Sequence, residues 1–445
     1  MNHSSVSSSR EMLTSWKEIA SYLRVDIKTA QRYEKKFDLP VHRREGFLRS
    51  RVFAYTDEID RWENKNSKIN SKDQRYIRFS KLRPYLLILA VVALATFLYF
   101  VYSRIARSAQ PANFKIDQST LVILNKLGRE LWLFDTQRPN LWDEKEYREG
   151  FQRKNDIPDE LRRLPVLIIK DINHDKLNET LFSVQTTDGL KAGILYCIDS
   201  KGTKLWEFRA GREIQLGPQV FSSDFVIIAV DIVDLNNDGN MEIVVISHVR
   251  EDSPTQVAVL NLEGVLLREY WNVGQFNDYA FEDLNDDGRR EILLVGQNNA
   301  YRRPCLVVLD VNSMKGISPS KMPFECPELA KGSEIYYLLF PLSELDLFNN
   351  PGIALCNINI LSNRHIKVET TFSNVIYELN FKLELEYITL SHIFERKYND
   401  AYREGKLKTA LDDKTKEIIQ KKLMNGIDYY DGKNWTRGGA MSNKW

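Results

Sequence analysis

The chain has 445 residues, a formal net charge of +1, 43% hydrophobic residues and 28% charged residues. This length exceeds what one hydrophobic core usually holds, so two or more domains are expected. The composition excludes a disordered chain, a collagen-like chain and a polytopic membrane protein. Four cysteines without CxxC spacing argue against both a cysteine zinc site and a disulfide scaffold.

The near-neutral total hides an uneven distribution of charge. Residues 1–83 contain 19 Lys/Arg and 11 Asp/Glu, a net charge of +8, whereas the rest of the chain carries −7. The sequence therefore joins a basic N-terminal segment to an acidic body.

Residues 11–66 have the pattern of a small α+β domain. Ser15 and Glu18 have capping-box spacing, and apolar residues follow at helical intervals as far as Leu23. Asp26 is a natural N-cap for a second helix, whose outer face is basic. A hairpin over 43–55 and a third helix capped by Thr56 complete the layout of a helix-turn-helix with a wing.

Four blocks of this segment resemble the winged-helix heads of excisionase/MerR-type bacterial regulators: Leu13–Ala20, Thr29–Glu34, Leu39–Arg43 and Arg51–Tyr55. The resemblance implies that the second helix enters the major groove of double-stranded DNA and that the wing grips the backbone. Carried over to this sequence, it places Lys28, Thr29 and Arg32 at base edges and Lys35, Arg43, Arg44, Arg49 and Arg51 at phosphates. A head this small is expected to bind as a homodimer. There are two alternatives to DNA binding. The basic face is only solvated, or the head binds cytoskeletal protein.

A basic linker over 67–83 precedes the longest uncharged run, which begins at Pro84 and ends at Tyr102. This run predicts one transmembrane helix over 84–105, the alternative being a buried core helix. Seven basic residues precede the run and three follow it, so the N-terminus is expected in the cytoplasm and the C-terminus outside it. The predicted location is the inner membrane, with a single span.

Three segments of the acidic body align with one another, and each has oxygen-bearing side chains at positions 1, 3, 5 and 9. Such side chains suit a hard cation, and we expect structural Ca²⁺. Two segments contain a turn glycine: Asp234, Asn236, Asp238 and Glu242, and then Asp283, Asn285, Asp287 and Glu291. In the weaker third set, Asp171, Asn173, Asp175 and Glu179, Lys176 replaces that glycine. The alternative is a set of ordinary Asx-rich turns without an ion.

A strand follows each of these loops, and hairpins with a glycine turn lie between them. The loops and strands over 164–310 resemble the FG-GAP/VCBS repeats of integrin-like β-propellers. The predicted fold of 113–390 is therefore an all-β propeller of about five to seven blades, followed by a short helical and aromatic tail over 391–445.

No phosphate-binding loop, GxSxG elbow or HExxH motif is present, so no enzyme is expected. Together the parts predict a membrane-anchored one-component transcriptional regulator. Its cytoplasmic head would bind DNA, and its extracytoplasmic propeller would sense an unknown ligand or protein. The alternative is a membrane-anchored scaffold or adhesion protein whose head binds cytoskeletal protein.

Overall fold

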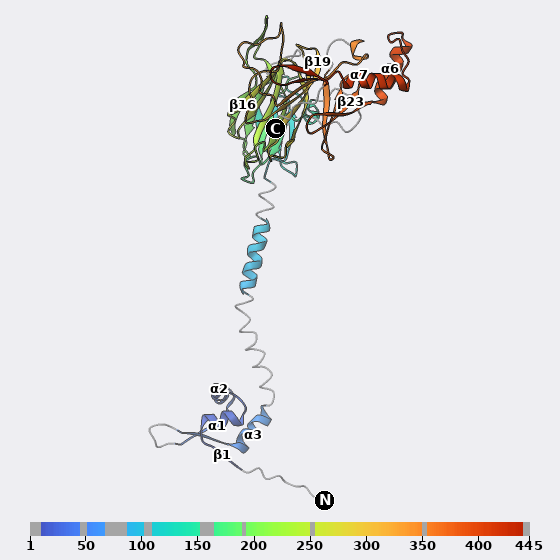
Figure 1. The fold of residues 1–445 in the computed structure, drawn as a ribbon. Coiled ribbons are helices and arrows are strands. Elements are labelled where there is room, and N and C mark those ends of the chain that lie inside the picture. The colour runs from blue at the N-terminus through green and yellow to red at the C-terminus, as the bar shows by residue number, and fades with distance from the viewer. Residues whose placement is uncertain are drawn as a thin grey trace. The chain divides into compact units, whose positions relative to one another are not determined.

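The computed structural model describes residues 10–44, 51–66, 87–101, 109–151, 164–188, 193–249, 254–348 and 354–438. The chain divides into two units, Met1–Ser103 and Arg104–Trp445. Figure 1 shows helices α1 to α3 in the first unit and most of the strands in the second.

The N-terminal unit contains three short helices and a three-stranded antiparallel sheet of order β1-β3-β2. Ser15 accepts a hydrogen bond from the Glu18 amide at 3.2 Å, and Asp26 accepts one from the Thr29 amide at 2.9 Å, so both predicted caps are confirmed. Thr56 does not cap α3, because its hydroxyl pairs with the backbone of Glu11. The elements are β1 (Met12–Leu13), α1 (Trp16–Tyr22), α2 (Ile27–Phe37), β2 (His42–Arg43), β3 (Val52–Tyr55) and α3 (Thr56–Lys65).

The prediction of a membrane span over 84–105 is wrong for the part of the chain that the structure describes. The described residues of this segment, 87–101, are helical. None of the described helices combines the length and apolar character required to cross a membrane. The predicted linker over 67–83 and both ends of the predicted span lie outside the described residues. The predicted single-pass location in the inner membrane and the predicted topology depended on this span, so both are wrong as well.

The C-terminal unit begins with two sheets joined by α5 (Glu144–Glu149). The first has three strands, β4 (Asn113–Asp117), β5 (Thr120–Leu124) and β6 (Glu130–Asp135). The second has four, β7 (Leu167–Lys170), β8 (Glu179–Ser183), β9 (Ile194–Ile198) and β10 (Lys204–Arg209). A small hairpin, β11 (Ile214–Leu216) and β12 (Gln219–Phe221), follows.

The remaining sheets contain the longest strands. One sheet comprises β13 (Phe225–Val233), β14 (Glu242–Val249), β15 (Thr255–Leu260) and β16 (Leu266–Asn272). The next comprises β17 (Phe276–Glu282), β18 (Glu291–Asn298), β19 (Arg303–Leu309) and β20 (Tyr336–Leu339), to which β25 (Asp428–Tyr430) and β26 (Trp435–Arg437) are added. After a 3₁₀ turn over Asp346–Phe348, the last sheet comprises β21 (Leu355–Leu361), β22 (His365–Thr370), β23 (Val375–Asn380) and β24 (Leu385–Leu390).

The predicted fold of residues 113–390, a propeller of five to seven blades, is wrong. Four apolar clusters fill the C-terminal unit, and each joins sheets that are neighbours in chain order. Among the described residues, none of these clusters joins the first sheet, β4–β6, to the last, β21–β24. The unit is a mostly β structure, and among its described strands no sheet closes on itself.

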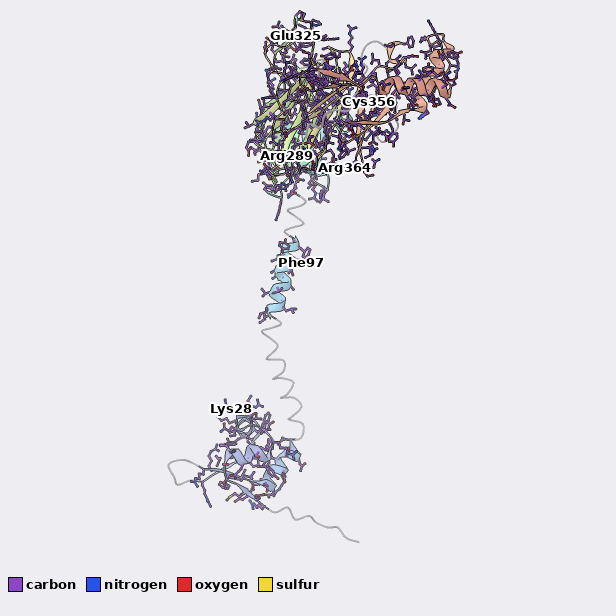
Figure 2. All side chains as sticks on the ribbon, viewed as in Figure 1. Lys28, Phe97, Arg289, Glu325, Cys356 and Arg364 are labelled. Carbon is purple, nitrogen blue, oxygen red and sulfur yellow. The ribbon has the colours of Figure 1, made fainter. Side chains whose placement is uncertain are left out.

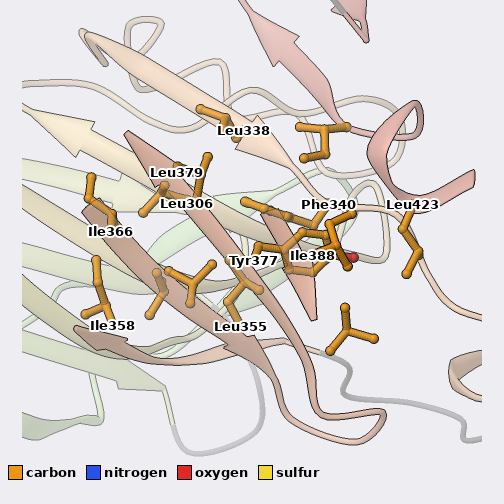
Figure 3. Close-up of a cluster of buried hydrophobic side chains, with 14 of the residues drawn as sticks. Leu306, Leu338, Phe340, Leu355, Ile358, Ile366, Tyr377, Leu379, Ile388 and Leu423 are labelled. Carbon is orange, nitrogen blue, oxygen red and sulfur yellow. The ribbon is translucent and has the colours of Figure 1, made fainter. Parts of the chain in front are cut away.

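The predicted helical tail is confirmed in part. It forms α6 (His392–Arg403) and α7 (Asp413–Met424), and both helices bury residues against the last sheet. Figure 3 shows this cluster, with Leu338 of β20, Leu379 of β23 and Leu423 of α7. The aromatic end extends one of the sheets: Tyr430 pairs with Tyr337 in the ladder between β25 and β20.

Tryptophans join consecutive sheets through the glycine turns of the predicted hairpins. The indole of Trp132 lies against the turn at Gly202 and donates a hydrogen bond to the Ser200 carbonyl at 3.2 Å. Trp206 repeats this contact on the next sheet, at Gly264, with a 2.7 Å bond to a turn carbonyl. Both turn residues have positive φ, which favours glycine. Because glycine has no Cβ, the indole can pack directly against each turn.

Candidate metal centre

The three aligned acidic segments form loops at equivalent places in three sheets. Each joins the first two antiparallel strands of its sheet: β7 to β8, β13 to β14 and β17 to β18. The glutamate at position 9 begins the returning strand, and Glu179, Glu242 and Glu291 face the residue just before position 1 across the ladder. The structure therefore places each predicted set in one loop between two paired strands.

The three glutamates share one geometry. Their exposed fractions are 4%, 6% and 3% for Glu179, Glu242 and Glu291. Each carboxylate accepts a hydrogen bond from the backbone amide at position 2 of its loop, at 3.2 Å, 2.9 Å and 3.0 Å respectively. A nearly buried carboxylate is thus held against the base of each loop.

Burial raises the pKa of all three glutamates, because the charged form loses solvation, and the loop aspartates add to this increase by repulsion. For Glu291 the pKa rises to about 7, with Asp287 and Asp283 as the repelling charges. The amide bonds oppose the shift without cancelling it. Each loop therefore concentrates negative charge around a carboxylate that ionises reluctantly.

The other loop oxygens accept hydrogen bonds from the loop backbone. In the second loop, Asn236 accepts from the Asp238 amide at 2.9 Å and Asp234 accepts from the Gly239 amide at 3.0 Å. The third loop repeats both bonds, at 3.0 Å and 2.8 Å, and the first loop has them at 2.9 Å each. Lys176 adopts the positive φ of the glycines at the same position, 71° against 86° for Gly239. Lys176 therefore changes the strain and charge of the first loop but not its shape.

The donor chemistry of the loops fits Ca²⁺, although the oxygens do not already converge. Within the described ranges no group of three or more His, Cys, Asp or Glu side chains is arranged to hold a metal ion. Carboxylate and amide oxygens are nevertheless the ligands that calcium prefers. In the first loop, Oδ1 of Asp171 is buried and finds no hydrogen-bond partner among the described residues. Binding would require the loop side chains to turn toward the ion.

In the third loop, an arginine would compete with a cation for one of the loop aspartates. Arg289 forms an ion pair with Asp287 at 2.6 Å, and this contact is the main reason that the pKa of Asp287 is lowered. The second loop has Asn240 at the equivalent position. The second loop is therefore the strongest candidate for a cation, a ranking that the sequence pattern did not provide.

The second and third loops lie side by side. The Arg290 amide donates a 2.8 Å hydrogen bond to the Leu235 carbonyl, and both loops line one polar recess of about 460 Å³ with Asp234, Asp283 and Arg290. A further arginine, Arg364 in the β21–β22 turn, binds Asp286 through both terminal nitrogens, at 2.7 Å and 3.0 Å. Figure 2 shows Arg289 and Arg364 at the same end of the C-terminal unit. Sequence reasoning missed this arginine because it lies in another sheet.

The predicted DNA-contacting residues lie on α2 and around the β2–β3 hairpin. Lys28, Lys35, Arg44 and Arg51 are exposed, Arg32 is half-buried, and Arg49 lies outside the described residues. Within the unit, the Thr29 hydroxyl donates to Asp26 at 2.7 Å, and Arg43 pairs with Glu34 at 2.6 Å. These contacts use Thr29 as part of a helix cap and Arg43 as a link between α2 and β2.

Comparisons with known proteins identify no family. No protein-family model matches the chain, and no curated protein matches it. Among solved structures it is similar to a protein of unknown function from Bacteroides caccae, with 12% identity, a TM-score of 0.28, and coverage of 63% of this chain and 74% of that one. It is also similar to BBS1N in complex with ARL6DN (12%, TM-score 0.31, coverage 64% and 69%) and to BamB from Moraxella catarrhalis (10%, 0.26, 62% and 69%). TM-scores this low carry no functional argument.

These findings correct the predicted families and function. The assignments to an excisionase/MerR-type head and to an FG-GAP/VCBS propeller are wrong, since no family model matches the chain. The predicted DNA-binding, membrane-anchored regulator is wrong as well, together with the DNA, membrane and homodimer partners that it implied. The predicted anchored scaffold required the same head and the same span, and no described helix can cross a membrane.

Proposed function

We propose that the C-terminal unit is a non-catalytic binding module that takes up Ca²⁺ at its acidic loops. One observation carries this proposal: three times in the unit, a nearly buried glutamate with a raised pKa lies beneath two aspartates of its own loop. Burial is the main cause of these raised pKa values, and a divalent cation would offset both the lost solvation of the glutamate and the repulsion from the loop aspartates.

Asp234, Asn236, Asp238 and Glu242 would hold the ion in the second loop, and Asp283, Asn285, Asp287 and Glu291 in the third. The ion would supply charge neutralisation and would brace the turn between the first two strands of each sheet. Because the Arg290 amide of the third loop binds the Leu235 carbonyl of the second, bracing one loop also restrains its neighbour. The first loop would contribute less, since Lys176 adds a positive charge to this loop.

Calcium should therefore stabilise the full-length protein against heat. A ligand that binds only the folded state adds about 2.7 kcal/mol per site at a hundredfold excess over Kd. We expect the melting temperature to rise in Ca²⁺ relative to chelator, and to rise less in the Asp238→Asn variant. Differential scanning fluorimetry in Ca²⁺, Mg²⁺ and chelator measures this effect.

Asp199→Asn is the matched control for this experiment. Asp199 accepts amide bonds from Lys201 and Thr203 at 2.9 Å and 2.7 Å, so it forms an Asx turn of the same chemistry as the acidic loops. Its loss should lower the melting temperature equally in Ca²⁺ and in chelator. Equal melting of the parent protein in both solutions would show that the acidic loops are plain turns.

A further inference from the structure

The C-terminal unit has a second recess at the end opposite the acidic loops. β18 leads away from the third loop, and at about 3.3 Å per residue its far end lies roughly 20 Å from Glu291. The turn after β18 contains Tyr301, which lines a pocket of about 460 Å³ together with the 317–332 segment and the C-terminal hairpin. Figure 2 shows Glu325 of this pocket at the other end of the unit from Arg289.

One wall of this pocket is aromatic. Trp435 of β26 lies against Tyr301, with ring centroids 5.1 Å apart, and against Tyr430 at 5.0 Å. The Trp435 indole nitrogen donates a hydrogen bond to the Tyr301 hydroxyl at 3.1 Å, which fixes the two rings relative to each other. Rings held by their neighbours lose little entropy when a ligand packs on them.

The pocket lining also carries a positive charge. Its lining residues include two lysines, Lys331 and Lys433, and one carboxylate, Glu325. Across the described segments neither lysine forms an ion pair, and both are exposed. A third lysine, Lys321, lies over the Tyr301 ring with its nitrogen 5.1 Å from the centroid.

We propose that this pocket binds a small organic anion with a flat apolar ring. The ring packs on the wall formed by Tyr301, Tyr430 and Trp435, and the anionic group lies between Lys331 and Lys433. The volume is in the range of small-molecule sites, which combine apolar walls with a few polar groups. This site is separate from the acidic loops, so it does not depend on calcium binding there.

The test uses two probes with the same ring, the anionic 6-fluoro-2-naphthoate and its neutral amide, with the full-length protein and ¹⁹F line broadening. We expect the naphthoate to bind with Kd below ~1 mM and more tightly than the amide. The Lys331→Gln/Lys433→Gln variant should weaken naphthoate binding at least about threefold, as the loss of two partly exposed ionic contacts implies, and leave amide binding unchanged. Trp435→Leu should weaken binding of both probes.

Lys382→Gln, on the exposed turn between β23 and β24, is the control and should bind both probes as the parent protein does. The proposal is overturned if the parent protein fails to broaden the naphthoate signal at millimolar concentration. Equal binding of both probes to the parent protein, or full naphthoate binding by the double lysine variant, would also overturn it.

Discussion

Glu291→Gln should make the calcium-free protein more stable at pH 8, by up to about 3 kcal/mol. The pKa of Glu291 rises from 4.5 to about 7 on folding, and one pKa unit corresponds to about 1.36 kcal/mol. Because the folded-state pKa is raised, the ionised carboxylate destabilises the fold, and stability falls as the pH rises from about 4.5 to about 7. Glutamine resembles the protonated acid and can still accept the hydrogen bond from the Leu284 amide.

The measurement is the urea midpoint of the full-length protein in chelator between pH 4 and pH 8. The gain from Glu291→Gln should be small at pH 4 and should develop by about pH 7. In excess Ca²⁺ the order should reverse, since the variant lacks one anionic ligand. Glu263→Gln, in an exposed turn, should show neither effect. A variant less stable than the parent protein at pH 8 in chelator would show that the Glu291 charge is already compensated.

Gly264→Ala should destabilise the protein by about 3 kcal/mol, because it disturbs the contact between two sheets. A Cβ at this glycine would lie 2.5 Å from Cδ2 of Trp206, and φ is +77°. The left-handed backbone accounts for roughly 1–2 kcal/mol, and displacement of the indole accounts for the remainder. Gly128 is the matched control, since it also has positive φ, +74°, in a hairpin turn but has no atom within 4 Å of the added Cβ.

A double-mutant cycle separates the two contributions. In a Trp206→Ala background, Gly264→Ala should cost no more than Gly128→Ala, which corresponds to a coupling of about 1–2 kcal/mol between the indole and the turn. Urea denaturation in chelator measures each corner of the cycle. An equal cost of Gly264→Ala with and without the indole would mean that Trp206 does not hold the sheets together.

Local features of the fold were predictable because their causes lie within a few residues. The Ser15 and Asp26 caps each use an amide three residues along the chain, so spacing alone identified them. The acidic loops were found in the same way, since an Asx turn and the glutamate that begins the next strand lie within nine residues. For such features the sequence by itself determined the local structure and its candidate ligands.

The tertiary structure decided what depended on partners distant in the sequence. The last strands join β20 through a pairing of Tyr430 with Tyr337, which no local pattern signals. The aromatic pocket follows from that pairing, since it brings Trp435 to Tyr301. Arg364 binds Asp286 from another sheet, and Arg43 is engaged by Glu34 of α2. Local spacing cannot encode these contacts, because their energy is gained only when the sheets and helices pack.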